Sequence, residues 1–170
     1  GQQTVEFAAT NFTADYLRPK VPYLDYHSDP VYFATDLALV RSFQTKFDDL
    51  WMDSTNFTNY ANVTTRARAY ATWPVASALS FVPEQNFLTR SKPFYDAETR
   101  QIDSIMYKIT EPGHADGLIR AAKRGVIVRL IVEPGGYRDT KNLWQAYNVD
   151  RLYAAGVRIK VRAHAGFLHQ

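Results

Sequence analysis

Two histidines near the end of the sequence have the side chains best suited to chemistry. His164 and His169 stand five positions apart in the final stretch VRAHAGFLHQ. Because an imidazole titrates near neutral pH, it can serve as a nucleophile, a general acid or base, or a metal ligand. Neither a carboxylate nor a third histidine stands near the pair, so the spacing does not favour a metal site. His169 is then either a surface residue or the beginning of a catalytic motif.

The composition limits the chemistry that the chain can support. Of its 170 residues 46% are hydrophobic and 22% are charged, which excludes disorder by composition. The net charge is only +3 and no polybasic run occurs, so nothing marks a nucleic-acid-binding protein. The absence of cysteine excludes disulfides and thiolate chemistry. No apolar stretch is long enough to span a membrane, no signal peptide opens the chain, and the compartment stays open.

The first third of the chain predicts two strands and a long helix. Alternation of polar and apolar residues predicts strands at 4–8 and 30–34. A helix follows, capped by Thr35 or Asp36, and it ends near Asp53. Apolar residues recur along it at three- and four-residue steps, and we expect its aromatic residues to be core: Phe43, Phe47 and Trp51. Most of the other aromatic rings are likewise assigned to packing rather than to base stacking.

Residues 54–90 are irregular in pattern and are interpreted as a connector, with a short helix around 56–63. From Ile102 onward strand and helix patterns alternate. Strands are predicted at 102–109, 126–132 and 157–163, the second of them buried despite Arg129. Pro112 fits the start of the first helix and Gly125 its end, and a second helix covers 142–155.

This βαβαβ order predicts parallel strands joined by right-handed crossovers. The strand-to-helix turns carry neither a G-x-G-x-x-G spacing nor a P-loop lysine, which argues against nucleotide binding. Ligands of parallel α/β sheets bind at the carboxyl ends of the strands, and His169 follows the last predicted strand. His114 and His27 are expected at the surface, at a helix start and in a loop.

The second half of the chain resembles the phospholipase D superfamily. The resemblance runs from IDSIMYKITEPGHADGLIRAAKRGVIVRLIVEPGGYRD to RLYAAGVRIKVRAHAGFLHQ. In that family such a βαβαβ unit leads directly into the motif H-x-K-x-x-x-x-D. GFLHQ looks like the opening of this motif, with His169 as its histidine. The lysine would be the residue after Gln170.

The first half resembles the segment that follows the family's other motif. VEFAATNFT is similar to the family's G-S-x-N-F/W turn, with Asn11 at the asparagine and Ala8 and Ala9 in place of glycine and serine. The stretch YHSDPVYFATDLALVRSFQTKFDDLWMDS is similar to the family's acidic residue, strand and F-D-x-L-W helix. Asp29 falls at the acidic position, where glutamate is more common.

The resemblance implies an α/β fold of the phospholipase D type, with a mixed or parallel sheet flanked by helices. Residues 1–53 would be the end of a first repeat, 54–100 a connector, and 101–170 the beginning of a second repeat. The family's active site is shared between two motifs. We therefore expect flanking segments of a longer chain to complete the site, and the 170 residues alone to be inactive.

The resemblance also implies a phosphodiesterase mechanism. One histidine forms a phosphohistidine and the other protonates the leaving alkoxide, so His169 is a catalytic candidate. Asp29 would orient an imidazole, and Asn11 would bind a phosphoryl oxygen. Neither a metal nor another cofactor is implied. The expected substrate is a phosphodiester, with a phospholipid favoured over nucleic acid. Two alternatives stay open: a non-catalytic module that binds an anion or assembles with another chain, and a nuclease-type member.

Overall fold

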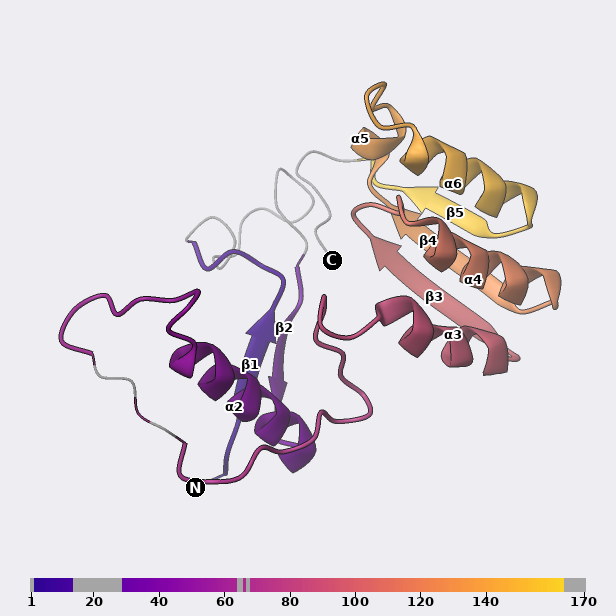
Figure 1. Ribbon diagram of the computed structural model, residues 1–170. Coiled ribbons are helices and arrows are strands. Elements are labelled where there is room, and N and C mark those ends of the chain that lie inside the picture. Colours follow the sequence, from indigo (N-terminus) through magenta and orange to yellow (C-terminus); the bar gives the residue numbers. More distant parts are fainter. Residues whose placement is uncertain (1, 14–28, 64–65, 67, 164–170) are drawn as a thin grey trace. The chain divides into compact units, whose positions relative to one another are not determined.

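The computed structural model describes residues 2–13, 29–63, 66 and 68–163 (Figure 1). It is a mixed α/β structure with a small antiparallel sheet and a three-stranded parallel sheet flanked by helices. The chain divides into two compact units. The first comprises residues 1–7 and 32–82, and the second comprises residues 8–31 and 83–170. His27, His164 and His169 lie outside the described residues.

The small sheet and one long helix form the centre of the first unit. Strands β1 (Val5–Ala8) and β2 (Val31–Ala34) pair with each other, and helix α2 spans Leu37–Met52. Asp36 caps this helix as predicted, because its carboxylate accepts a hydrogen bond from Leu39 N at 3.0 Å. Aromatic stacking joins sheet and helix: Phe7 lies 5.0 Å, centroid to centroid, from both Tyr32 and Phe43.

The assignment of Phe47 and Trp51 to the core is wrong. Both rings are exposed and stack on each other, with their centroids 5.7 Å apart. Val40, Ser42 and Thr45 are buried instead. The two hydroxyls accept backbone hydrogen bonds from the irregular segment that follows, Ser42 Oγ from Ala76 N at 2.8 Å and Thr45 Oγ1 from Trp73 N at 3.1 Å. The buried side of α2 thus holds a loop through polar contacts, which the hydrophobic pattern does not indicate.

The predicted connector contains a helix at its end, whereas the short helix predicted around 56–63 does not form. Residues 56–63 are irregular, apart from a turn residue at 56 and a bend at 61–62. They follow Asp53, whose carboxylate accepts hydrogen bonds from Thr55 N, Asn56 N and Asn56 Nδ2. The Asn56 side-chain hydrogen bond is the main cause of a lowered pKa of Asp53. Helix α3 spans Phe87–Ala97 and is capped by Asn86, whose side chain accepts from Thr89 N at 3.0 Å.

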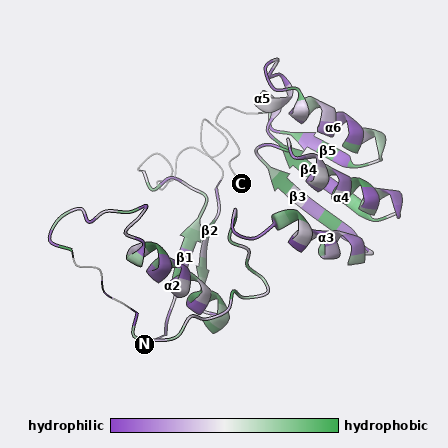
Figure 2. Ribbon diagram, viewed as in Figure 1, coloured by the Kyte–Doolittle hydropathy of each residue, from purple (hydrophilic) through white to green (hydrophobic). Residues whose placement is uncertain are grey.

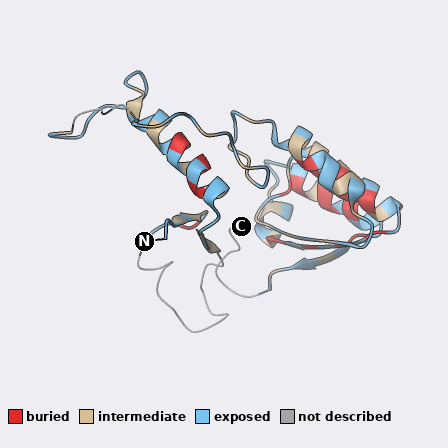
Figure 3. Cartoon of the chain, turned by 90° about the horizontal axis from the view of Figure 1, so that it is seen from below, coloured by how far each residue is buried: buried red, intermediate tan, exposed pale blue. Residues whose placement is uncertain are grey.

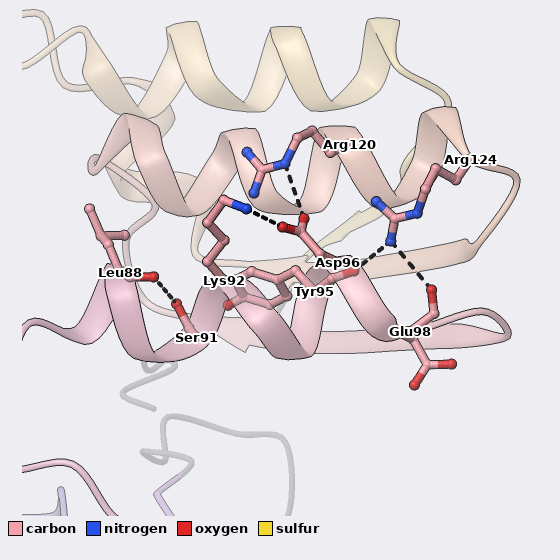
Figure 4. A network of polar contacts seen from close by, with 8 residues as sticks. All are labelled: Leu88, Ser91, Lys92, Tyr95, Asp96, Glu98, Arg120 and Arg124. Carbon is pink, nitrogen blue, oxygen red and sulfur yellow. Dashed lines mark hydrogen bonds and ion pairs between the residues drawn. The ribbon is translucent and has the colours of Figure 1, made fainter.

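Helix α3 packs on helix α4 (Pro112–Lys123) in the second unit, and polar side chains bridge the two (Figure 4). Arg120 Nε donates to Asp96 Oδ1 at 3.2 Å, and Lys92 also contacts this carboxylate. Arg124 donates to the backbone carbonyls of Tyr95 and Glu98, which lie at the end of α3. Carbonyls at a helix end lack intrahelical donors, so Arg124 stabilises this terminus.

The parallel βαβαβ order is confirmed. Strands β3 (Gln101–Met106), β4 (Ile127–Val132) and β5 (Arg158–Val161) pair in parallel in the order β3-β4-β5. Three helices connect them: α4, the short α5 (Pro134–Tyr137) and α6 (Trp144–Ala154). Pro112 begins α4 and Gly125 follows its end with φ +91°, both as predicted. In a parallel βαβ unit the chain leaves each strand at the carboxyl edge of the sheet, and the following helix runs back to the opposite edge. Helix α6 therefore begins at the carboxyl edge.

Within the described part of the chain one face of this sheet is covered, so the prediction of a buried strand at 126–132 is wrong for three of its seven side chains. Val128, Leu130 and Val132 pack under the helices, whereas Ile127, Arg129 and Ile131 are exposed. Buried residues of the helices face the sheet in Figure 3, and β3 carries a hydrophilic band between hydrophobic ends in Figure 2. Arg129 lies opposite Asp103 and forms two hydrogen bonds with it, which lowers the pKa of Asp103.

None of the described helices combines the length and the apolar character that crossing a lipid bilayer would demand.

Candidate functional site at the carboxyl edge of the parallel sheet

A buried ion pair occupies the carboxyl edge of the parallel sheet. Glu133 follows β4 directly and Arg162 follows β5 directly. The strand ladder continues one residue beyond each strand, since Glu133 N donates to Met106 O and Arg162 N to Val132 O, both at 3.3 Å. Parallel pairing in this register places the two side chains next to each other.

The geometry of the Glu133–Arg162 pair is bidentate. Arg162 Nε donates to Glu133 Oε2 at 2.8 Å, and Arg162 Nη2 donates to Glu133 Oε1 at 2.9 Å. The side chains are only 11% exposed for Arg162 and 7% for Glu133. Two parallel charge-assisted hydrogen bonds in a poorly solvated place are strong and directional. The pair therefore fixes the ends of β4 and β5 relative to each other, directly before the segment that carries His169.

The loop after β3 is fixed at the same edge by two side chains of α6. Gln145 Oε1 accepts from Ile109 N at 2.6 Å, and Asn148 Nδ2 donates to Ile109 O at 2.9 Å. Gln145 and Asn148 are three positions apart, so they share a face of the helix. All three residues are buried, so both polar groups of the Ile109 backbone are satisfied without water. We call this arrangement the α6 clamp.

Of the three predicted site residues, Asn11 and Asp29 lie in the described part of the chain and His169 does not. Asn11 is exposed, three positions after β1, and its carbonyl accepts from Thr13 N at 2.8 Å in a tight turn. Asp29 is half-buried, two positions before β2. Antiparallel pairing puts the end of β1 and the start of β2 at the same end of the small sheet, and both residues fall in the compact unit that contains the parallel sheet. Their roles, and that of His169, stay predictions.

The prediction that His114 lies at the surface is wrong. His114 is buried near the start of α4, where Tyr95 Oη lies 2.8 Å from its Nδ1 and Phe87 stacks on its ring. Its backbone N donates to the capping carboxylate of Glu111 at 2.6 Å. Burial lowers the pKa of the His114 imidazole, against the opposing effect of the Glu111 charge. The imidazole lies against the rings of Phe87 and Tyr95 and so contributes to the packing of α3 on α4.

Lowering the pH is expected to destabilise the chain through His114. Because its pKa in the folded state lies below the ordinary 6.5, the unfolded state binds the proton more tightly. The contribution is fully present above the unfolded pKa and is lost as the pH falls through the folded pKa. We therefore expect the free energy of unfolding, measured with urea, to fall less between about pH 7 and pH 5 for His114→Asn than for the wild type. Tyr153→Phe, at an exposed tyrosine of helix α6, leaves the surroundings of His114 unchanged; it is the control and should keep the wild-type slope. Equal slopes for His114→Asn and wild type would contradict this account.

The described residues do not assemble a metal site. Among residues 2–13, 29–63, 66 and 68–163, no three His, Cys, Asp or Glu side chains gather closely enough to hold an ion. What the carboxyl edge offers is a fixed guanidinium–carboxylate pair, a clamped loop, and the beginning of helix α6.

The class that these observations define is a mixed α/β protein with a polar carboxyl edge on a parallel sheet. No protein-family model, no curated protein and no solved structure matches the chain.

Sequence reasoning does not identify two features of the edge. Glu133 falls in a predicted turn, and Arg162 in a predicted strand of alternating basic residues. The sequence signal for this ion pair is an acidic residue directly after one parallel strand and a basic residue directly after the neighbouring strand. The α6 clamp has a weaker signal, a Gln and an Asn on the core side of an amphipathic helix.

Proposed function

We propose that the chain forms part of a phosphodiester-cleaving site of the phospholipase D type, with His169 as a catalytic imidazole. The observation that carries the proposal is the polar carboxyl edge of the parallel sheet. Strand β5 ends there at Val161, and His169 follows eight positions later in the sequence. Ligands of parallel α/β sheets bind at this edge, which supports a catalytic role for the motif-like sequence GFLHQ that follows β5 along the chain.

In the proposed reaction one imidazole attacks phosphorus and displaces the alkoxide, to which a second imidazole gives a proton. Water, deprotonated by that second imidazole, then cleaves the phosphohistidine. His169 takes one of these two roles, and the second histidine would come from outside residues 1–170. Asp29 would orient an imidazole through its far ring nitrogen, and Asn11 would donate a hydrogen bond to a phosphoryl oxygen. The Glu133–Arg162 pair would act indirectly, by fixing the strand ends before His169.

The two neighbouring histidines allow a matched test in the full-length gene product. His169→Ala should lower kcat for bis(p-nitrophenyl) phosphate by about 10³-fold or more, because a nucleophile or general acid is lost. His164→Ala should change it by no more than about threefold. The substrate is soluble and has no lipid or nucleic-acid part, so the assay tests phosphodiester chemistry alone.

Equal activities of the wild type, His164→Ala and His169→Ala would overturn the role of His169. No hydrolysis by the wild type, together with a residue other than lysine after Gln170 in the gene, would favour the non-catalytic module instead. Comparing phosphatidylcholine vesicles with single-stranded DNA as substrates then separates a lipid-cleaving member from a nuclease.

A further inference from the structure

We propose that the amino-terminal end of helix α6 carries a docking patch for a lipid surface. This patch, the α6 patch, consists of Leu143, Trp144 and Tyr147. Their exposed fractions are 66%, 52% and 52%. Together with Lys141 and Asn142 they line a shallow open cleft. Docking requires no catalysis, so the inference goes beyond the proposed function and does not depend on it.

The patch lies on the side of α6 that faces away from the core. The buried side of the helix is formed by Gln145, Asn148, Val149 and Leu152. Trp144 and Tyr147 are three positions apart and share the opposite side, with their ring centroids 5.6 Å apart at nearly a right angle. Arg151, one turn further, lies over the Tyr147 ring and also pairs with Asp116 of α4. The two rings are therefore held in place while their outer surfaces stay open.

The residue types fit a lipid interface. Tryptophan and tyrosine have an apolar body and a polar tip, and they collect at the level of lipid headgroups. Leu143, at the cap position of the helix, supplies an aliphatic side chain that can enter the acyl region. Lys141 is exposed and lines the same cleft, and Arg138, three positions earlier in the sequence, is also exposed; both side chains suit the phosphates of a lipid surface.

Charge argues against nucleic acid as the occupant. The segment 137–151 carries three basic residues, Arg138, Lys141 and Arg151, and two acidic ones, Asp139 and Asp150, so its excess is one positive charge. Arg151 is already paired with Asp116. Nucleic-acid binding depends on several cations that neutralise phosphates, and this segment does not supply them.

Size argues against a protein partner. Three side chains cover far less than the roughly 800 Å² per partner that a stable protein interface buries. Shallow insertion into a lipid surface needs only a few apolar side chains, because each one that enters the acyl region contributes separately.

The position of the patch gives the docking a direction. Helix α6 begins at the carboxyl edge of the sheet, because it follows β4 and α5 in the parallel βαβ order. A lipid surface bound at the α6 patch would therefore lie beside the edge that carries Glu133 and Arg162.

The test is sedimentation of the whole chain with vesicles of phosphatidylcholine containing about one third phosphatidylserine. The wild type should bind, and Trp144→Ser should bind about tenfold more weakly, as expected for losing one buried aromatic ring. Tyr153→Ser is the matched control, since Tyr153 is 75% exposed at the other end of the same helix, and it should bind like the wild type. Leu143→Ala is a second patch variant, with an expected weakening of several-fold. Far-UV circular dichroism checks that each variant is folded.

Salt and a second probe separate lipid docking from the alternatives. Binding should weaken only modestly between about 0.1 M and 0.5 M salt, because salt screens the attraction of nearby cations to the lipid phosphates but not the insertion of the apolar side chains. A single-stranded oligonucleotide should not bind. Wild-type binding that Trp144→Ser and Leu143→Ala leave unchanged, or no binding to vesicles, would overturn the proposal. Salt-sensitive binding of the oligonucleotide that Trp144→Ser abolishes would overturn it in favour of a base-stacking surface. Because no hydrolysis is measured, these outcomes are independent of the activity test with His169.

Discussion

Replacing Glu133 by alanine is expected to lower the free energy of unfolding by about 3–5 kcal/mol, the range for removing one partner of a buried ion pair. The substitution takes away both carboxylate oxygens to which Arg162 donates, at 2.8 and 2.9 Å. The guanidinium is then left at a place where it is largely shielded from water, and its desolvation is no longer offset. Urea unfolding followed by far-UV circular dichroism measures the loss.

The exposed pair on the same sheet provides the control. Asp103 and Arg129 are also bidentate, but both side chains are about half exposed. Asp103→Ala should therefore leave the urea midpoint nearly unchanged, because exposed ion pairs contribute little. Replacing Glu133 and Arg162 together by leucine should recover most of the loss. A loss for Glu133→Ala as small as that for Asp103→Ala would mean that the edge is far better hydrated than its geometry indicates.

Replacing Leu118 by alanine is expected to lower the free energy of unfolding by about 2–5 kcal/mol. Leu118 belongs to helix α4 and is fully buried in the core of the second unit, where the helix packs on the covered face of the sheet. Its loss removes apolar contacts and leaves a cavity that the surrounding strand and helices can fill only in part. The same urea titration measures the effect.

The identical substitution at Leu143 is the matched control for Leu118. Leu143 is 66% exposed at the start of α6, so Leu143→Ala should change the stability by less than about 0.5 kcal/mol. A comparable loss at the two sites would show that Leu143 is packed, and it would also weaken the argument that the α6 patch is open to a partner.

The order of elements in the second unit could be predicted because local signals agree there. Pro112 and Gly125 mark the ends of α4, and the apolar periods change from helix to strand where the elements change. Helix α3 could not be predicted in this way, since Pro93 stands inside it and Ser91 is its buried residue. Polar contacts to Arg120 and Arg124 help to hold this helix, and such contacts leave no hydrophobic pattern to recognise.

Periodicity identifies the side chains that share a side of an element, but not whether anything covers that side. Phe47 and Trp51 fit the helical stripe of α2 and are nevertheless exposed. Ile131 lies in an apolar run and is also exposed, because the described helices cover the opposite face of the sheet. Arg129 was the contrary signal: a charge in the middle of a strand is typical of a face that meets water.

The sequence predicts the carboxyl edge of the parallel sheet but not the side chains that meet there. His169 follows the last strand in sequence order, and its role stays a prediction because it lies outside the described residues. The pairing of Glu133 with Arg162 depends on the register of β4 against β5, which no local pattern encodes. The environment of His114 depends on α3, so an incorrect assignment of that segment also gave an incorrect environment for the histidine.

The α6 clamp makes the stability of the loop after β3 depend on the stability of helix α6. Gln145 and Asn148 satisfy both polar groups of the Ile109 backbone, so α6 cannot separate from the sheet without leaving that peptide unpaired. We therefore expect the loop after β3 and helix α6 to open together. By linkage, a ligand that binds at the α6 patch only while these segments are closed stabilises the loop at the carboxyl edge as well, by an amount set by the ligand concentration relative to its Kd.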